Sequence, residues 1–187
     1  MITSKHDLQE YINADNAFYK IKGCKNRFIS ILINDPRIII ERFLVHLRKQ
    51  EFYINTAKGN KLKGLLGLYH ERKKNKLGYL IGIEIGPNCF GKGLHIFHGN
   101  IVVNAAVRAG DNCRLHGCNC IGNNGIVDIT PKIGDNVDIG YGVSIIGNVS
   151  ISDNVTIGAN ALVNRSFPSN TIIAGVPAKI IRQNNER

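Results

Sequence analysis

The 187-residue sequence has no apolar run long enough to cross a bilayer. Its longest apolar stretches, residues 28–33 and 37–40, fall far short of the roughly 20 residues that a spanning helix needs. Residues 1–10 are polar and charged, and they lack the apolar core of a secretory signal. These absences predict a soluble protein located in the cytoplasm, without a transmembrane segment.

The cysteines match neither a disulfide framework nor a common zinc motif. Their number is odd, there is no C-x-x-C pair, and they stand at Cys24, Cys89, Cys113, Cys118 and Cys120. The pair Cys118 and Cys120, with His116 nearby, suggests zinc, but no second ligand pair follows at a metal-binding spacing. We therefore expect no metal, and we interpret the cysteines as small apolar residues of a tight core.

The net charge of +10 is concentrated in one half of the chain. Residues 1–80 hold 16 Lys and Arg against seven acids, whereas residues 81–187 hold eight against seven. A basic half is attracted to anionic surfaces, phosphorylated ligands or nucleic acid, although a solvated helical surface accounts for it equally well. The basic residues form no known nucleic-acid-binding motif, so we expect no nucleic-acid partner.

Residues 1–80 have the pattern of an α-helical region. Asp35 and Pro36 form a helix start, with a capping acid followed by proline at the first helical position. Apolar residues then recur at helical spacing as far as Tyr53, and a second such stripe runs from Leu62 towards Lys76 after a polar break around Gly59. An earlier helix is expected at residues 7–19.

Residues 81–187 follow a six-residue repeat and contain 15 of the 20 glycines. Thirteen of the 14 positions taken in steps of six from Ile85 to Val163 are apolar; Phe97 is one of them, and Gly91 is the exception. Each step is a short flat strand that points one apolar side chain into a narrow prism, with small or turn-prone residues at the corners. Three such faces make a coil of about 18 residues, and the coils stack by parallel pairing. We predict a parallel β-helix, with residues 122–130 projecting as a loop.

The repeats end in the closing sequence of residues 174–180, Ala-Gly-Val-Pro-Ala-Lys-Ile, and residues 94–98 read Leu-His-Ile-Phe-His. In these motifs, residues 80–182 resemble the hexapeptide-repeat acyltransferases, most of all the serine acetyltransferases and the O-acetyltransferases of capsule and lipopolysaccharide pathways. The resemblance implies a left-handed β-helix, a mainly β protein with an α-helical N-terminal region, and an enzyme that transfers an acetyl group from acetyl-CoA to a hydroxyl.

The resemblance places the catalytic histidine at His98. Acetyl transfer needs a base near pH 7 for the hydroxyl proton, which suits histidine, and donors for the oxyanion formed at the thioester carbon. His116 follows 18 residues later, so an unbroken repeat would set it directly beside His98, roughly 5 Å away. It is the second catalytic candidate. For both histidines an ordinary surface role is the alternative.

The same resemblance implies a homotrimer with acetyl-CoA in the groove between neighbouring prisms. Carried over by position, the cofactor-binding candidates are two sets of corner residues and two cations for the nucleotide phosphates: Gly140, Tyr141, Gly142, Gly158, Ala159, Asn160, Lys179 and Arg182. Corner and tail residues of an ordinary coil would account for the glycines equally well.

Three positions depart from the serine acetyltransferase pattern. Phe97 stands where those enzymes have an aspartate before the catalytic histidine, and Ile129 and Thr130 replace an arginine and a histidine. Because an amino acid's charged groups need charged partners, we expect a sugar acceptor of a capsule or lipopolysaccharide pathway, small or lipid-linked, with the basic half near a membrane. Serine is the alternative acceptor, and a β-helix without catalysis, acting in binding or assembly, is the alternative class.

Overall fold

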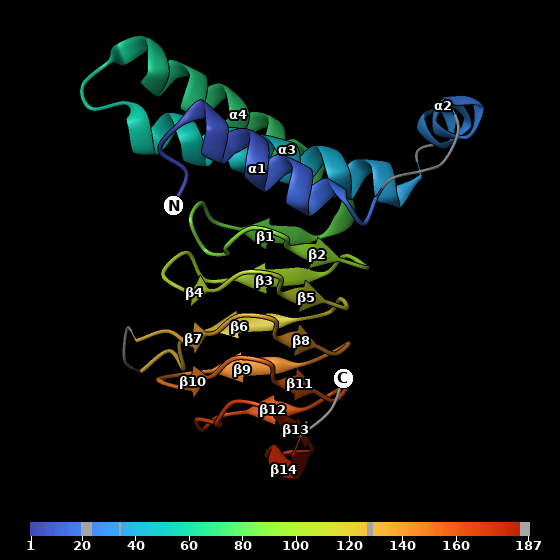
Figure 1. The fold of residues 1–187 in the computed structure, drawn as a ribbon, viewed down its shortest axis with the longest axis vertical. Coiled ribbons are helices and arrows are strands. Elements are labelled where there is room, and N and C mark those ends of the chain that lie inside the picture. The colour runs from blue at the N-terminus through green and yellow to red at the C-terminus, as the bar shows by residue number, and fades with distance from the viewer. Residues whose placement is uncertain (20–23, 34, 127–128, 184–187) are drawn as a thin grey trace. The chain divides into compact units, whose positions relative to one another are not determined.

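The computed structural model describes residues 1–19, 24–33, 35–126 and 129–183. Its contacts divide the chain into two compact units, Met1–Ile81 and Gly82–Arg187. The first unit holds all the helices of the described chain and the second all its strands (Figure 1). The predicted combination of an N-terminal helical region with a mainly β remainder is confirmed.

The helical unit contains α1 (Lys5–Asn16), α2 (Cys24–Leu32), α3 (Pro36–Thr56) and α4 (Lys61–Ile81). The predicted start of α3 is confirmed, because the Asp35 side chain accepts a hydrogen bond from the Arg37 N–H and Pro36 opens the helix. At α1, Ser4 and Asp7 form a capping box that satisfies two backbone donors. No helix in the described part of the chain is both long and apolar enough to cross a membrane.

The helices α1 and α4 both pack on α3, whose apolar side chains form much of the core of this unit. A fully buried cation lies within that core. The Arg48 guanidinium is 2.7 Å from Asp15 of α1 and 3.0 Å from Glu51 of α3. The two carboxylates hold the pKa of Arg48 above its usual value despite the burial. This ion-pair network joins α1 to α3.

The strands of the second unit form three sheets, one on each face of a prism. The β3 face consists of β1 (Ile83–Ile85), β3 (Ile101–Val103), β6 (Cys120–Gly122), β9 (Ser144–Ile146) and β12 (Leu162–Val163). The β4 face consists of β4 (Arg108–Ala109), β7 (Lys132–Ile133) and β10 (Ser150–Ile151). The β5 face consists of β2 (His95–Ile96), β5 (Arg114–Leu115), β8 (Asp138–Ile139), β11 (Thr156–Ile157), β13 (Thr171–Ala174) and β14 (Lys179–Gln183).

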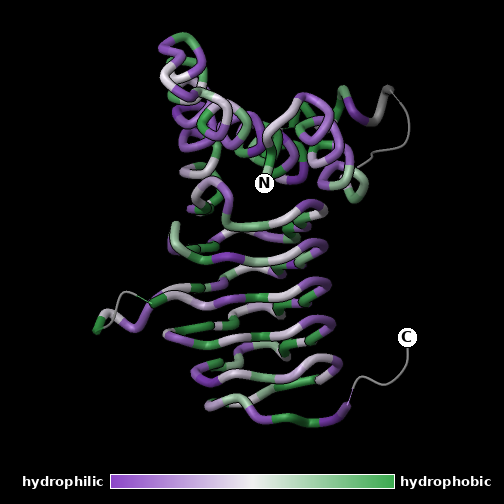
Figure 2. Tube along the Cα trace, turned by 60° about the vertical axis from the view of Figure 1, so that its left-hand side comes forward, coloured by the Kyte–Doolittle hydropathy of each residue, from purple (hydrophilic) through white to green (hydrophobic). Residues whose placement is uncertain are grey.

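Neighbouring strands on every face are parallel, except that β14 runs antiparallel to β13. Successive coils therefore stack in register, as Figure 1 shows, and this confirms the predicted parallel β-helix. Between β6 and β7 the chain leaves the stack, and the described residues Asn124, Gly125, Ile126 and Ile129 are exposed. Figure 2 shows this loop projecting from the coils, where it was expected.

The six-residue phase slips near the start of the prism. The apolar side chains that fill the core there are Phe90 and Ile96, 4% and 0% exposed, instead of Gly91 and Phe97. Phe97, which the repeat places inside, is 39% exposed. The repeat is restored from Val103 onwards. The expected inward position at residue 127 lies outside the described residues.

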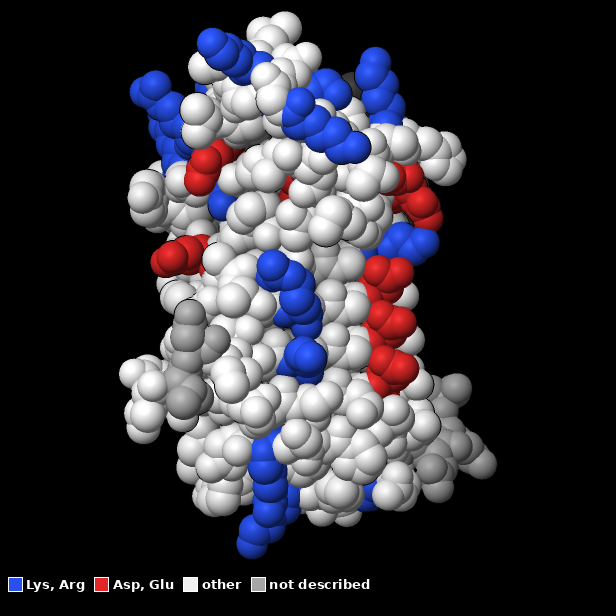
Figure 3. All heavy atoms as spheres, turned by 90° about the vertical axis from the view of Figure 1, so that its left-hand side faces the viewer, with Lys and Arg blue, Asp and Glu red and all other residues white. Residues whose placement is uncertain are grey.

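Asparagines and aspartates form ladders along one corner of the prism. Asn112, Asn136, Asn154 and Asn170 all have positive φ angles, and each side-chain amide donates to the next asparagine at 3.0–3.1 Å. Asparagine tolerates this left-handed conformation better than most residues. Beside this ladder the carboxylates of the next column, Asp111, Asp135 and Asp153, accept backbone N–H bonds from neighbouring coils. Figure 3 shows acidic side chains gathered in such a column. These carboxylates therefore stabilise the stacking of the coils.

Candidate active site

The turns that follow the strands of the β5 face stack into one corner of the prism, here called the site corner. His98 follows β2, Gly117 follows β5, Tyr141 follows β8 and Ala159 follows β11. Backbone hydrogen bonds join these turns in sequence: Cys118 N–H to Gly99 O, Gly142 N–H to Gly117 O, and Asn160 N–H to Tyr141 O, at 2.8–3.0 Å. The structure therefore brings His98 together with both sets of predicted cofactor-binding corner residues.

His98 is exposed at the site corner, and within the described part of the chain no hydrogen bond to its ring is found. Its backbone neighbour in the next coil is Gly117, whose φ is +116°. A Cβ on Gly117 would lie 2.8 Å from the His98 Cβ, closer than real Cβ atoms approach other atoms. A glycine is therefore required beside His98, and the imidazole stays open to a ligand.

The expected stacking of His116 on His98 is wrong. The register pairs His95 with Arg114, an offset of 19 residues, because the coil between them has one residue more than the repeat. His116 consequently lies beside Phe97, and the two rings stack with centroids 4.4 Å apart.

His116 instead forms a pair with a carboxylate. Its Nε2 lies 2.7 Å from Asp138 Oδ1 of the neighbouring coil, and the imidazole is 38% exposed. The Arg114 guanidinium lies 3.6 Å from the other oxygen of Asp138. On the other side of Phe97, the His95 ring packs with its centroid 4.0 Å away. Burial, with Arg114 as the next contribution, lowers the pKa of His95 to about 4.

The predicted cofactor-binding glycines are required by the coil geometry. A Cβ on Gly140 would come within 2.6 Å of the Ile157 carbonyl oxygen, and one on Gly158 within 2.9 Å of the Ala174 Cβ. Gly142 has φ +73° and lies against Asn160. The coil geometry therefore accounts for these three glycines without a ligand, which is the alternative that the sequence left open, and all three are half-buried at the site corner.

The remaining cofactor candidates lie on the same face. Tyr141 is 49% exposed, and its hydroxyl oxygen accepts a hydrogen bond from the Cys118 thiol at 2.9 Å, which raises the pKa of Tyr141. Lys179 and Arg182 are exposed residues of β14, where Lys179 pairs with Ala174 at the edge of the β5 face. The structure thus brings all eight candidates to one side of the prism.

The cysteines divide into two groups. Cys89 and Cys113 are buried, as the core interpretation expects, and burial raises the pKa of Cys113 to about 12. Cys118 is half-buried and Cys120 exposed, so that interpretation is wrong for them, while the Cys24 side chain lies outside the described residues. Among the residues that the structure describes, no group of three or more His, Cys, Asp or Glu side chains could hold a metal ion.

Arg114 and Asp138 were not identified from the sequence. Arg114 opens the short strand β5 and His116 directly follows it, two residues later, so the alternation of side chains puts both on one face. That spacing was an available signal. Asp138 comes 22 residues after His116, across the projecting loop, so only the register between coils brings it to this site.

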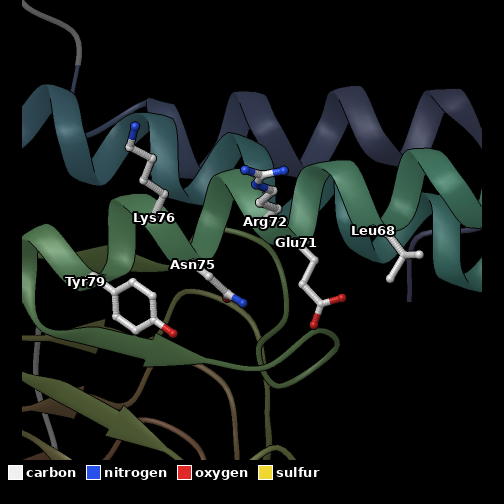
Figure 4. A pocket seen from close by; sticks show the side chains of 6 residues that line it. All are labelled: Leu68, Glu71, Arg72, Asn75, Lys76 and Tyr79. Carbon is white, nitrogen blue, oxygen red and sulfur yellow. The ribbon is translucent and has the colours of Figure 1, made fainter.

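A hollow on the helical unit lies apart from these residues in the sequence. It is lined by α4 side chains alone, Leu68, Glu71, Arg72, Asn75, Lys76 and Tyr79, and Figure 4 shows them along that helix. None of the predicted site residues lines it. Its two cations belong to the basic half of the chain, for which the sequence left open either an attraction to anions or an ordinary solvated helical surface.

A search against protein-family models found no match. Among curated proteins, a serine acetyltransferase of Staphylococcus epidermidis is 40% identical over 113 residues, which cover 58% of this chain and 53% of that protein. The chain thus spans about half the length of such curated relatives. The β-helix of this chain resembles that of serine acetyltransferases.

Two solved structures have the same fold over nearly the whole chain. Serine acetyltransferase of Neisseria gonorrhoeae is 25% identical with a TM-score of 0.66, covering 98% of this chain and 70% of that one. Serine acetyltransferase of Brucella abortus in complex with coenzyme A is 24% identical with a TM-score of 0.68, covering 96% and 68%. The fold is a left-handed parallel β-helix with an N-terminal helical region.

The expectation of a sugar acceptor from a capsule or lipopolysaccharide pathway is wrong. Curated relatives that match this chain, from Staphylococcus epidermidis and Staphylococcus xylosus, are serine acetyltransferases. The expectation depended on Phe97, Ile129 and Thr130 as the absent charges of an amino-acid site. Those three positions are not the only ones near His98, because charged groups of both signs, Arg114 and Asp138, stand on the adjoining β5 face.

Proposed function

We propose that this chain transfers the acetyl group of acetyl-CoA to the hydroxyl of L-serine. The observation that carries the proposal is the 40% identity over 113 residues to a serine acetyltransferase. The complex of a similar fold with coenzyme A supports the same cosubstrate.

In the proposed reaction His98 is the general base. Its exposed imidazole takes the proton of the serine hydroxyl as the hydroxyl oxygen attacks the thioester carbonyl carbon. The resulting oxyanion accepts hydrogen bonds from backbone N–H groups or amide side chains. The carbon–sulfur bond then breaks, and the coenzyme A thiolate takes the proton from the imidazolium. The products are O-acetylserine and coenzyme A.

The site corner is the proposed path of the pantetheine arm. Gly140, Gly142 and Gly158 are half-buried there, and the exposed residues Tyr141, Ala159 and Asn160 lie alongside them. Lys179 and Arg182, at the far edge of the same face, are the proposed partners of the nucleotide phosphates. We further propose that the protein is a homotrimer in which this groove is closed by a neighbouring prism.

The test is thiol release from acetyl-CoA in the presence of L-serine. We expect turnover by the wild-type protein and a loss of at least about 100-fold in kcat for His98→Ala, because general base catalysis contributes on the order of 10²–10⁴-fold. His6→Ala is the matched control, since His6 is an exposed histidine of α1, and it should leave kcat unchanged.

Two outcomes would contradict the proposal in different ways. Activity that survives His98→Ala means that the base is another residue. A protein without turnover whose thermal unfolding does not shift with coenzyme A acts as a binding or assembly module, because a ligand that binds the native state must stabilise it.

A further inference from the structure

Charged and aromatic side chains gather on the outer surface of the β5 face beside His98. They are His95, Phe97, Arg114, His116 and Asp138, here called the face cluster. The strand register sets Arg114 between His95 and Asp138, with Phe97 and His116 one step further along the strands. The cluster contains a cation and an anion within two coils of the proposed base.

The pairing of Arg114 with Asp138 is loose. Their closest atoms, Nη1 and Oδ2, are 3.6 Å apart, which is beyond hydrogen-bond distance. Arg27 and Glu41 of the helical unit, by contrast, form two hydrogen bonds at 2.9 and 3.0 Å. Within the described chain no hydrogen bond from the Arg114 side chain is found, and the side chain is 45% exposed. Its N–H fork is free to bind a planar carboxylate with two parallel hydrogen bonds.

Asp138 retains acceptor capacity on the same surface. One oxygen bonds to His116 Nε2 at 2.7 Å, while the other faces Arg114 without a hydrogen bond. A carboxylate accepts about four hydrogen bonds in all, so Asp138 can also accept from an ammonium group. The His116 pair fixes its orientation.

The surroundings of the Asp138 carboxylate are partly dehydrated. The Phe97 ring lies between the His95 and His116 rings, with centroids 4.0 and 4.4 Å away, and the Asp138 side chain is only 22% exposed. The lowered pKa of His95 has burial as its first cause. Ionic contacts are stronger in such surroundings than in open water.

The cluster lies within reach of His98. His98 lies beside Gly117 of the next coil, and Arg114 precedes Gly117 by three residues, roughly 10 Å along a strand. The side chains of histidine and arginine, with an amino acid between them, can span that distance. A hydroxyl at His98 therefore leaves the charged end of a small zwitterion over the face cluster.

We propose that Arg114 binds the carboxylate of the amino-acid acceptor and Asp138 its ammonium group. This assignment rests on the proposed function, since it presumes a zwitterionic acceptor with a hydroxyl. Arg114 and Asp138 would thus supply the charged partners that an amino-acid acceptor needs and that Phe97, Ile129 and Thr130 cannot supply.

The test compares acceptors that lack one charge. With Arg114→Gln, kcat/KM for L-serine should fall about 10- to 100-fold, because a hydrogen bond between charged groups is lost. The fall should lie in KM, and kcat/KM for serinamide, which lacks the carboxylate charge, should stay within about twofold. Asp138→Asn should lower kcat/KM for L-serine by a similar factor. It should leave kcat/KM for 3-hydroxypropionate, which lacks the ammonium group, unchanged.

Lys132→Gln is the matched control, since it removes one exposed positive charge from the β4 face, and it should change neither acceptor's kinetics. If Arg114→Gln lowers kcat/KM equally for L-serine and serinamide, or raises only the KM for acetyl-CoA, the proposed role of Arg114 is wrong. Thermal melts of each variant identify losses caused by unfolding. Arg114→Lys, which keeps the charge without the fork, should lie between wild type and Arg114→Gln.

The two proposals fail differently. A wild-type protein that neither binds nor acetylates L-serine contradicts the proposed function and the assignment together. A wild-type enzyme active on L-serine whose preference for it over serinamide survives Arg114→Gln contradicts the assignment alone.

Discussion

At the scale of single residues, the position of His98 depends on the absence of a side chain at Gly117. The two lie against each other in adjacent coils, and Gly117 has a φ of +116° that L-residues with a Cβ rarely adopt. Any Cβ there pushes on the His98 Cβ and on the Gly99 carbonyl oxygen, which would be 3.2 Å away.

We therefore predict that Gly117→Ala lowers both stability and activity. The strained backbone should cost about 1–3 kcal/mol of unfolding free energy, and displacement of His98 should reduce kcat by at least about tenfold. Denaturant unfolding and the thiol-release assay measure the two effects.

Gly125→Ala is the control for that prediction. Gly125 also has a positive φ, +74°, but a Cβ there would meet nothing within 4 Å. Gly125→Ala should lower the free energy of unfolding, as the strained backbone predicts, and leave the activity unchanged. A fully active Gly117→Ala enzyme would show that the site tolerates displacement of His98.

At the scale of secondary-structure elements, a buried ion-pair network joins α1 to α3. The Arg48 side chain is 0% exposed, and Asp15 and Glu51, its partners, are 1% and 2% exposed. Removing one member of a buried pair leaves a buried charge uncompensated.

We predict that Arg48→Ala destabilises the protein by about 3–5 kcal/mol, as seen when buried pairs are broken. Arg37→Ala is the matched control. Arg37 also lies on α3, and its pair with Asp35 leaves its side chain 63% exposed, so that the change should cost at most about 1 kcal/mol. Chemical denaturation followed by circular dichroism measures the free energy of unfolding of both variants. Similar costs for both would mean that the network around Arg48 is not a source of stability.

Elements were largely predictable from local pattern. The start of α3 at Asp35 and Pro36, and the strands from Val103 onwards, follow from capping chemistry and a six-residue repeat. The slip that turns Phe97 outwards was not predictable. A single extra residue in a coil keeps the local pattern intact and changes only which of two adjacent apolar residues, Ile96 or Phe97, enters the core.

At the scale of the whole molecule, the proposed groove needs a neighbouring prism to close it. We predict that the protein in solution has three times the 20.6 kDa mass of one chain, measured by light scattering on a sizing column. A monomer with full activity would contradict the proposed shared groove, because its site would be complete in one chain.

The sequence alone predicted the β-helix and the helical region, and its motif indicated His98 as the candidate base, because a repeat, a cap and a motif are properties of neighbouring residues. The tertiary structure decided which residues surround His98. Coils of unequal length set Gly117 beside His98 and His116 beside Phe97. The same register brings Asp138 to Arg114 across an offset of 24 residues that includes the projecting loop. Such offsets depend on how every coil fills the common core, and that is a property of the whole stack rather than of any segment.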